Sequence, residues 1–441
     1  MLELLTLGLF LLVLIACIAA GVPTTYALLA GLALFCAYAL RAGNRPGDVL
    51  AMCWHGIRPV RRILAMLLAV GALTGLWRAA GVIPAIVFYA APLIAPSLFL
   101  VMAFLLNCLV SVLTGSSFGT SATMGAICVS LASSMGVPLV AAGGAALSGA
   151  FFGDRWSPIS TSGLLVASVT GTDFYGNLGR MFRSAAVPFA VTCAAFLVAG
   201  AVLPAQAGSA DAVAALGEHF DLSLAVLVPP ALVFALAAAR ADILVVVLAG
   251  AASSVPLCVA LQGMGAAEVL RVCALGYAPA APGLASLAGG GVSSMLSAVG
   301  IVCVTSAYSG IFEETDLLRR VEGAVVSCTA RVSPFAATLG VSVAASAVSC
   351  NQTLAIMLAH QLCRNLPQTP EQRALDLEDS VVLVSGLIPW SIAGGVPLAS
   401  MGAPIASMAA AVFLYAVPVW RLARSAAARM RSRGTRRGQA G

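Results

Sequence analysis

The residues that could do chemistry lie inside an apolar part of the chain. Residues 153–162 read Gly-Asp-Arg-Trp-Ser-Pro-Ile-Ser-Thr-Ser, within the largely apolar, small-residue stretch 138–171. Charges such as Asp154 and Arg155 cost about 2.5–3.5 kcal/mol each at the centre of a membrane helix. Pro158 also frees backbone carbonyls, which are tolerated only inside protein or against a water-filled cavity. We interpret this segment as a site for an ion or small molecule; the alternative is a kinked helix with a satisfied Asp154–Arg155 pair.

Composition indicates that the elements around this segment cross a membrane. Of the 441 residues, 61% are hydrophobic and 9% are charged, whereas soluble domains carry about 25% charged residues. We therefore predict an all-α polytopic membrane protein with the lipid bilayer as its partner. The net charge of +6 comes largely from loops and the tail, so nucleic acid is not an expected partner. The 12 Cys show no metal-ligand spacing, and we expect neither a structural metal nor a cofactor.

Charge gives the expected orientation of the first half. Two apolar runs, 4–20 and 22–40, are followed by a stretch with five Arg residues and one acid, Asp48. The positive-inside rule places this stretch in the cytoplasm, and the N-terminus with it. Within the stretch, residues 48–57 are expected to form a short interfacial helix. The tail after Trp420 carries seven Arg residues and is predicted to be cytoplasmic and to face lipid headgroups.

The second half of the sequence echoes the first. Four short motifs recur in the same order at offsets of 220 to 235 residues. The paired segments are 48–56 with 268–276, 74–77 with 309–312, 114–118 with 349–353, and 158–160 with 389–391. Ordered echoes of this kind indicate an internal repeat. We predict a first unit at 1–220, a second at 221–420 and a basic tail at 421–441.

The exchanged Arg balance of the two units predicts that they are inverted in the membrane. The counterpart of the Arg-rich inner loop, 262–282, holds one Arg and should lie outside, whereas the Arg-rich loop 318–332 should lie inside. Each unit is expected to have about five crossings, a broken helix and a re-entrant hairpin, at 97–134 and at 334–362. Inverted repeats with interrupted apolar segments are typical of secondary transporters.

The hairpin tips and the first broken helix offer oxygen ligands. Hydroxyls, amides and freed carbonyls suit an alkali cation, whereas helix N-termini at the same breaks suit an anion or carboxylate. The sequence permits either ligand, and the alternative is a set of Ser and Thr contacts between packed helices. The residues that we expect to line the site are Thr114, Ser116, Ser117, Ser157, Ser160, Thr161, Asn351, Gln352 and Thr353.

A proton-coupled carrier needs a titratable group in its site. Asp154 is the strongest candidate because it lies inside an apolar run. The second-tier candidates are Glu378, Asp379 and Ser391, which belong to the second broken span. For the two acids, the alternative is an interfacial pair that caps the helix.

At these residues the chain resembles the NhaC family of Na⁺/H⁺ antiporters. The matching motifs are 71–77, 81–84, 114–120, 148–160, 310–312, 377–380 and 387–391. The resemblance implies an exchanger of Na⁺ for H⁺, and some relatives look like Na⁺-linked exchangers of malate and lactate. We therefore expect a multi-pass protein of the bacterial inner membrane with both termini in the cytoplasm. A homodimer is one assembly that we consider.

The chain departs from the family pattern where ions are expected to bind. Thr161 stands where the family has Asp, and Asn351 stands where the second tip of the family has Asp. Two expected carboxylates are thus absent, which leaves Asp154 as the main intramembrane acid. A neutral-lined site would suit an organic substrate better.

From the sequence we expect a secondary transporter that works by alternating access, with Na⁺/H⁺ antiport as its leading function. The alternative is a Na⁺- or H⁺-linked carrier of a small organic acid or amino acid. A channel fits less well, because two inverted hairpins that meet at a closed midplane suit a rocking motion. We do not expect an enzyme, since we find no catalytic set such as HExxH.

Overall fold

The structure is a computed structural model that describes most of the chain. The described residues are 2–19, 24–90, 95–203, 216–239, 241–279, 284, 287–315 and 333–438. Within them the chain is helical, and the β pairing that occurs there is a single bridge between Tyr277 and Gly289. The prediction of an all-α fold is confirmed. The predicted inner loop 318–332 lies outside the described residues.

The first half begins with two helices and continues through a long helical run at Pro46–Ala79. The helices that follow this run are interrupted repeatedly. Its helices are α1 (Leu2–Ala19), α2 (Thr24–Arg41), α3 (Pro46–Ile57), η1 (Arg58–Val60), α4 (Arg61–Ala79), α5 (Val82–Ala90), η2 (Pro96–Leu98), α6 (Phe99–Thr114), α7 (Ser117–Thr120), the π-helical η3 (Ser121–Gly125), α8 (Ala126–Ser134), α9 (Leu139–Trp156), α10 (Thr161–Thr170) and α11 (Phe174–Val202). α11 is 29 residues long, whereas α10 has only 10 residues.

The second half follows a similar order of long and broken helices. Its helices are η4 (Leu224–Leu227), α13 (Val228–Ala238), α14 (Ile243–Ala260), α15 (Ala266–Leu275), η6 (Val292–Met295), α16 (Leu296–Thr315), α18 (Pro334–Ser349), α19 (Gln352–Cys363), α20 (Pro370–Glu378), α21 (Val381–Val384), η8 (Ser385–Leu387), α22 (Ile392–Met401), η9 (Ile405–Ala410) and α23 (Val412–Gly438). α18 and α19 pack closely against each other, as the two arms of a hairpin would.

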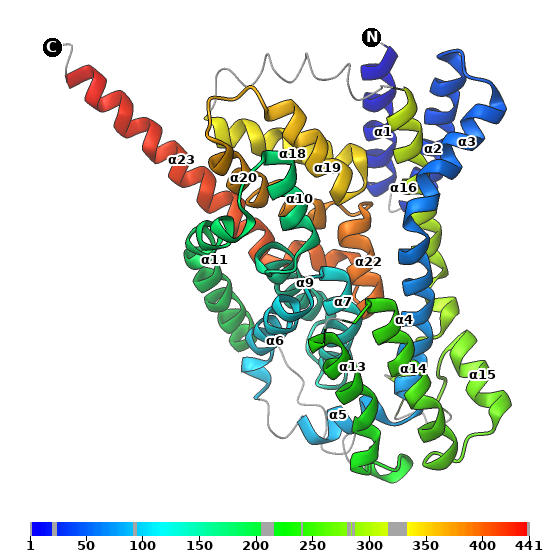
Figure 1. Cartoon of the computed structure of the whole chain (residues 1–441). Helices are drawn as coiled ribbons and strands as arrows, with labels where there is room; N and C mark the ends of the chain where they lie inside the picture. Colours follow the sequence, from blue (N-terminus) through cyan, green and yellow to red (C-terminus); the bar gives the residue numbers. More distant parts are fainter. Residues whose placement is uncertain are drawn as a thin grey trace.

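Each half contributes one long helix to the other half. α4 packs against α14 and α15, and α16 packs in the same way against α2 and α3. Figure 1 shows the two groups as separate layers, with α1–α3 and α16 above and α13–α15 beside the lower part of α4. This matched packing supports the division into two inverted units, which stays a prediction.

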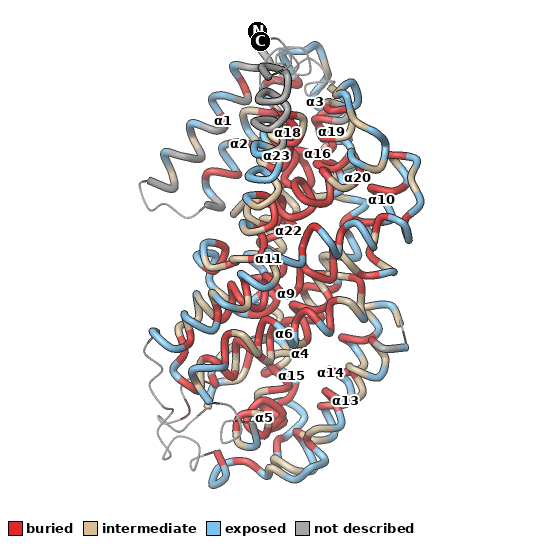
Figure 2. The backbone as a smooth tube through the Cα atoms, turned by 90° about the vertical axis from the view of Figure 1, so that its left-hand side faces the viewer, coloured by how far each residue is buried: buried red, intermediate tan, exposed pale blue. Residues whose placement is uncertain are grey.

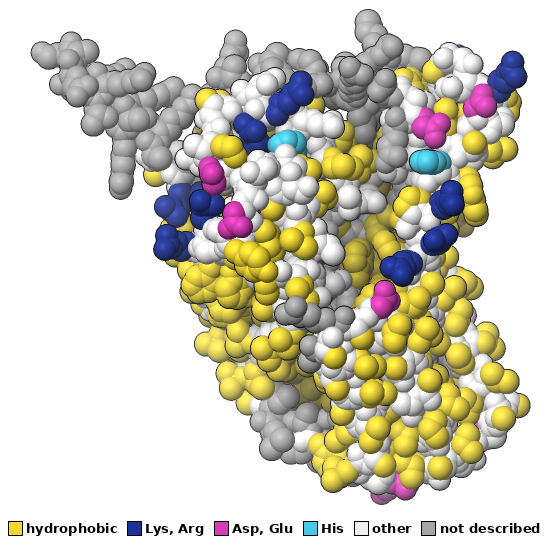
Figure 3. All heavy atoms as spheres, in the orientation of Figure 1, with side chains coloured by type: hydrophobic (Ala, Val, Ile, Leu, Met, Phe, Trp, Pro, Cys, Tyr) yellow, Lys and Arg dark blue, Asp and Glu magenta, His cyan; other side chains and the backbone are white. Residues whose placement is uncertain are grey.

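The apolar surface of the molecule fits a membrane environment. Figure 3 shows hydrophobic side chains over most of the lower part of one face, while the Arg side chains lie on its upper and middle parts. Among the described helices, five are long and apolar enough to span a membrane, or six if the bent pair at 370–401 counts as one span. The chain is therefore a multi-pass membrane protein. The larger predicted number of crossings rests on helices as short as α10 and α18, and it stays a prediction.

The core is built around α9, which is buried along most of its length (Figure 2). Its close partner is α6, and small residues let the two backbones approach. A Cβ on Gly153 would lie 2.1 Å from the carbonyl carbon of Ser111, and one on Gly149 would lie 2.5 Å from the carbonyl oxygen of Phe104. The glycines thus place the last turn of α9, which carries Asp154, directly against α6.

This approach predicts that Gly153→Ala destabilises the protein. The added methyl group meets backbone atoms that cannot rotate away, and overpacking of this kind costs about 1–3 kcal/mol. The measurement is the midpoint of thermal unfolding in detergent. The matched control is Gly179→Ala in α11, where no atom lies within 4 Å of the new Cβ. A midpoint for Gly153→Ala equal to that of the control would show that α6 and α9 are not packed this closely.

Candidate functional site

Two tight turns of the same geometry mark the predicted hairpin tips. Gly115 ends α6 in the left-handed conformation with φ 64°, and the extended Ser116 then caps α7 by accepting a hydrogen bond from a backbone N–H at 3.3 Å. Cys350 ends α18 with φ 55°, and the extended Asn351 caps α19 in the same way at 2.9 Å. Cys350 is the non-glycine residue with positive φ in the described chain. The sequence repeat at these positions is therefore accompanied by a repeat of the backbone conformation.

Two helix breaks of similar geometry lie beside these turns. Ser160 follows the break after α9, and its Oγ accepts a backbone N–H of α10 at 3.0 Å. Ser391 follows the break after η8, and its Oγ accepts a backbone N–H of α22 at 3.2 Å. Each break is tied to a neighbour: Ser157 Oγ donates to the carbonyl of Val112 in α6 at 2.6 Å. At the second break, a backbone N–H of α22 donates to the carbonyl of Cys350 at 2.9 Å.

Asp154 lies where elements of both halves meet. It occupies the last turn of α9 and is 3% exposed. Gln352, the first residue of α19, donates from Nε2 to Asp154 Oδ2 at 3.1 Å and to the carbonyl of Val382 at 3.0 Å. The backbone of Ser117 and the side chain of Ser162 also lie close to the carboxylate. All the direct partners of Asp154 in the described chain are therefore neutral groups.

The hydroxyls after the first break stabilise the end of α9. Ser160 and Ser162 both donate to the carbonyl of Asp154, the latter at 2.8 Å, and their two oxygens lie 3.0 Å apart. They satisfy the carbonyl that Pro158 leaves free in the broken helix. Sequence reasoning proposed Ser160 as a lining residue but passed over Ser162, although both belong to the same Ser-Thr-Ser run.

Arg155 points away from Asp154 and is paired elsewhere. Its guanidinium is fully buried and forms an ion pair with Asp379, and it also donates to Ser184 Oγ at 2.7 Å. The second oxygen of Asp379 lies 2.9 Å from Nε of Arg421, which also pairs with Asp376. The alternative of a satisfied Asp154–Arg155 pair is wrong, because the acid that neutralises Arg155 comes from the second half of the chain.

This charge network revises two further interpretations. Asp379 occupies the C-cap of α20, as the alternative expected, but it is completely buried between two guanidinium groups and is therefore not interfacial. Arg421 is only 20% exposed and belongs to the same network, so the expectation of headgroup contact does not extend to this residue of the tail. Sequence reasoning could not find Ser184, Asp376 or Arg421, because their partners in this network lie 29 to 195 positions away.

Glu378 is a second buried acid beside Asp154. It is 2% exposed, and its Oε2 has no hydrogen-bond partner within the described residues. It lies close enough to Asp154 and Arg155 to interact electrostatically with both. The structure thus distinguishes two neighbouring acids: Asp379 is paired with two guanidinium groups, whereas Glu378 is buried with one oxygen that has no hydrogen bond within the described residues.

The remaining predicted residues surround this group without contacting the Asp154 carboxylate. Thr114 Oγ1 lies 3.0 Å from Thr120 Oγ1, which links α6 to α7. Thr161 and Thr353 are exposed residues at the starts of α10 and α19. Asn351 uses its Oδ1 as a cap, which leaves its amide NH₂ available. The hydroxyls hydrogen-bonded to Asp154 are those of Ser160 and Ser162, and both contact its backbone carbonyl.

Comparison with known proteins decides the family. The sequence profile described as "Na+/H+ antiporter family" matches residues 4–176 and 149–420 of this chain. The chain belongs to the Na⁺/H⁺ antiporter family. The family predicted from the motifs is confirmed, and with it the class of the protein, a transporter and not an enzyme. Residues 115–119 fit the pattern GxSxG by letters, but helices flank them on both sides, without the strand that a nucleophile elbow needs.

Three relatives of this transporter bear names that state different activities. The chain is 28% identical to a "Malate-2H(+)/Na(+)-lactate antiporter" of Bacillus subtilis (strain 168), over 80% of this chain and 78% of the relative. It is 27% identical to the "Na(+)/H(+) antiporter NhaC" of Alkalihalophilus pseudofirmus, over 79% and 77%. It is 28% identical to the "Arginine/ornithine antiporter ArcD" of Halobacterium salinarum, over 74% and 70%.

The neighbouring acids Glu378 and Asp379, at the end of α20 and directly after it, should differ sharply in their effect on stability when neutralised. Asp379→Asn leaves Arg155 buried without its counter-charge, and breaking a buried pair costs about 3–5 kcal/mol. Glu378→Gln removes an acid whose Oε2 has no hydrogen bond to lose, so the midpoint of thermal unfolding in detergent should stay the same or rise. Equal losses for both variants would contradict the assignment of Asp379 as the partner of Arg155.

Proposed function

We propose that this transporter exchanges Na⁺ for H⁺ by alternating access, with Asp154 binding the cation and the proton in turn. The observation that carries the proposal is the place of Asp154, buried at the junction of a turn and a broken helix from the first half with α19 of the second half. A movement of one half against the other would open or close this junction. The deprotonated carboxylate attracts Na⁺, and protonation releases it. Membership of the Na⁺/H⁺ antiporter family supports this assignment.

The neighbours of Asp154 suit a group that changes its charge. Asp379 is held between Arg155 and Arg421, so loss of its negative charge would leave buried guanidinium groups unmatched. Asp154 has only neutral donors such as Gln352, so no fixed cation depends on its charge. Glu378 is close by and is the second acid available to carry a proton.

A carrier of a small organic acid or amino acid is the second candidate. Thr161 and Asn351 are neutral where the resemblance to NhaC implies carboxylates, so a cation would meet less negative charge here. Two relatives bear names that state organic substrates, malate with lactate and arginine with ornithine. The neutral positions lie at the starts of α10 and α19, where helix N-termini favour a carboxylate.

The proposal also includes the membrane, the orientation and the partners of the transporter. We place it in the bacterial inner membrane with both termini in the cytoplasm, supported by the Arg residues between α2 and α4 and along α23. Its partners would be lipid, the transported Na⁺ and H⁺, and in one arrangement a second copy of the chain. No resident cofactor or structural metal is part of this mechanism.

Asp154→Asn should abolish Na⁺-driven proton movement in proteoliposomes. The amide keeps the size and hydrogen bonding of the carboxyl group but cannot titrate. Dequenching of a pH-sensitive dye after addition of Na⁺ measures the exchange, and uptake of labelled lactate or arginine is measured in the same vesicles. The control is Asp173→Asn, the same change at an exposed helix cap.

Exchange with the wild-type rate and pH dependence in Asp154→Asn would rule out Asp154 as the coupling group. If the wild-type protein accumulates an organic substrate but moves no protons in response to Na⁺, the second candidate function replaces the first.

A further inference from the structure

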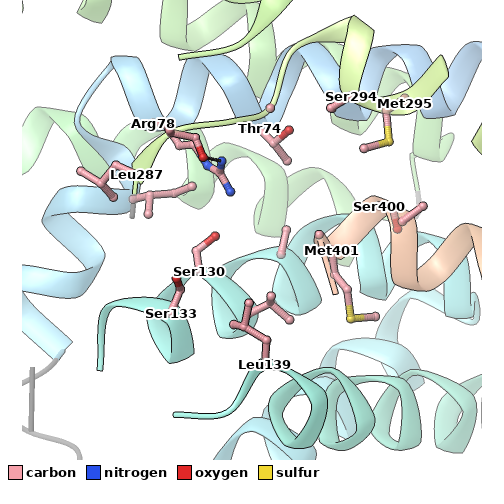
Figure 4. A pocket seen from close by; sticks show the side chains of 17 residues that line it. Thr74, Arg78, Ser130, Ser133, Leu139, Leu287, Ser294, Met295, Ser400 and Met401 are labelled. Carbon is pink, nitrogen blue, oxygen red and sulfur yellow. Dashed lines mark hydrogen bonds between the residues drawn. The ribbon is translucent and has the colours of Figure 1, made fainter. Parts of the chain in front are cut away.

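A cavity lies away from Asp154, between α4, α8, the end of α22 and the segment before α16 (Figure 4). Its volume is about 360 Å³, within the range of cavities that bind small molecules. None of the residues that contact Asp154 lines it. Among its described lining residues, Arg78 carries a charge and none is acidic.

The second half of the chain holds Arg78 in place. Its Nη1 donates to the carbonyl of Ala288 at 2.7 Å. A Cβ on the next residue, Gly289, would lie 2.4 Å from the same nitrogen, so only glycine permits this approach at a φ of +125°. Two residues later the backbone N–H of Gly291 donates to the carbonyl of Gly71 in α4 at 2.7 Å. The guanidinium is therefore preorganised before any ligand arrives.

The rest of the guanidinium faces the cavity. A guanidinium has five N–H donors, and the carbonyl of Ala288 occupies a single one. Figure 4 shows the group directed across the cavity toward Ser130 and Ser133 of α8. By contrast, the hydroxyls of Ser294 and Ser400 donate to carbonyls of their own segments, at 2.7 and 2.8 Å. Donors for an anion are thus concentrated at the end of the cavity where Arg78 lies.

Apolar side chains also line the cavity. Leu139, Leu287 and Met401 line it opposite and beside the guanidinium (Figure 4). An inorganic anion would use the guanidinium but not these walls. A zwitterionic amino acid would place its ammonium group in a cavity whose described lining lacks an acid. A short aliphatic chain that ends in a carboxylate satisfies both the charged and the apolar parts.

We propose that this cavity binds a small aliphatic carboxylate, with Arg78 as its anchor. A guanidinium and a carboxylate match in shape as well as charge, since two parallel N–H···O bonds can form. A carboxylate also supplies the counter-charge that the described lining does not provide. The site is separate from the group around Asp154, so it does not depend on whether the protein exchanges Na⁺ for H⁺.

Binding of labelled lactate to the purified full-length protein in nanodiscs tests the proposal. Lactate should bind in a saturable manner and be displaced by butyrate, whereas chloride and arginine at the same concentration should not displace it. Arg78→Gln should weaken binding at least about tenfold, since it removes a charge-assisted bidentate contact. Arg78→Lys should keep part of the affinity because it retains the charge. Asp173→Asn, a change at an exposed helix cap, should bind lactate as the wild type does.

Three results would overturn the proposal: no saturable lactate binding by the wild type, equal affinity in Arg78→Gln, or displacement by chloride as effective as displacement by butyrate. Ser133→Leu provides a second test if Arg78→Gln does not purify as a folded protein. Its larger side chain fills the cavity opposite Arg78 while the charge remains. Undiminished lactate binding in Ser133→Leu would place the bound lactate elsewhere.

Discussion

The structure depends on a buried ion pair between Arg155 of α9 and Asp379 of the segment after α20. A guanidinium at membrane depth is tolerated when its charge and its donors are satisfied. Here Asp379 matches the charge, and Ser184 and the carbonyl of Met181 accept hydrogen bonds from the terminal nitrogens of the guanidinium. Because these partners come from α11 and from the second half of the chain, the pair holds the end of α9 against both. Arg421 adds α23 to the same network.

This constraint determines what Asp154 can do. Adjacent residues of a helix point about 100° apart, so Arg155 faces the ion-pair network while Asp154 faces α7 and α19. The positive charge next to Asp154 in sequence is therefore already matched by Asp379. Asp154 keeps only neutral hydrogen-bond donors, and its proton can come and go without leaving a fixed cation unmatched. Arg155 thus has a structural role in the ion pair, which leaves the neighbouring Asp154 free to change its charge during exchange.

Local signals predicted much of this site, and long-range pairing explains the rest. The hydroxyl-rich run after α9 and its counterpart in the second half correctly predicted the helix breaks. The polar motifs at 114–118 and 349–353 indicated where the turns at Gly115 and Cys350 lie. Both signals are local, because proline and short polar side chains act on the backbone nearby. The partner of Arg155 could not be predicted, since the adjacent acid was the obvious choice and the true one lies 224 positions away. Arg78 was passed over for a similar reason: near the end of a span, an Arg side chain normally reaches the headgroups.

The central claim is that one carboxylate, Asp154, exchanges a proton for Na⁺. Titration calorimetry of Na⁺ binding in buffers of different ionisation enthalpy measures the number of protons released per Na⁺ bound. If Asp154 is the exchanging group, the wild-type protein should release about half a proton per Na⁺ at a pH equal to the pKa of the site and close to one at lower pH, whereas Asp154→Asn should release none. Na⁺ binding without proton release at any pH, or the same release from Asp154→Asn, would contradict the claim.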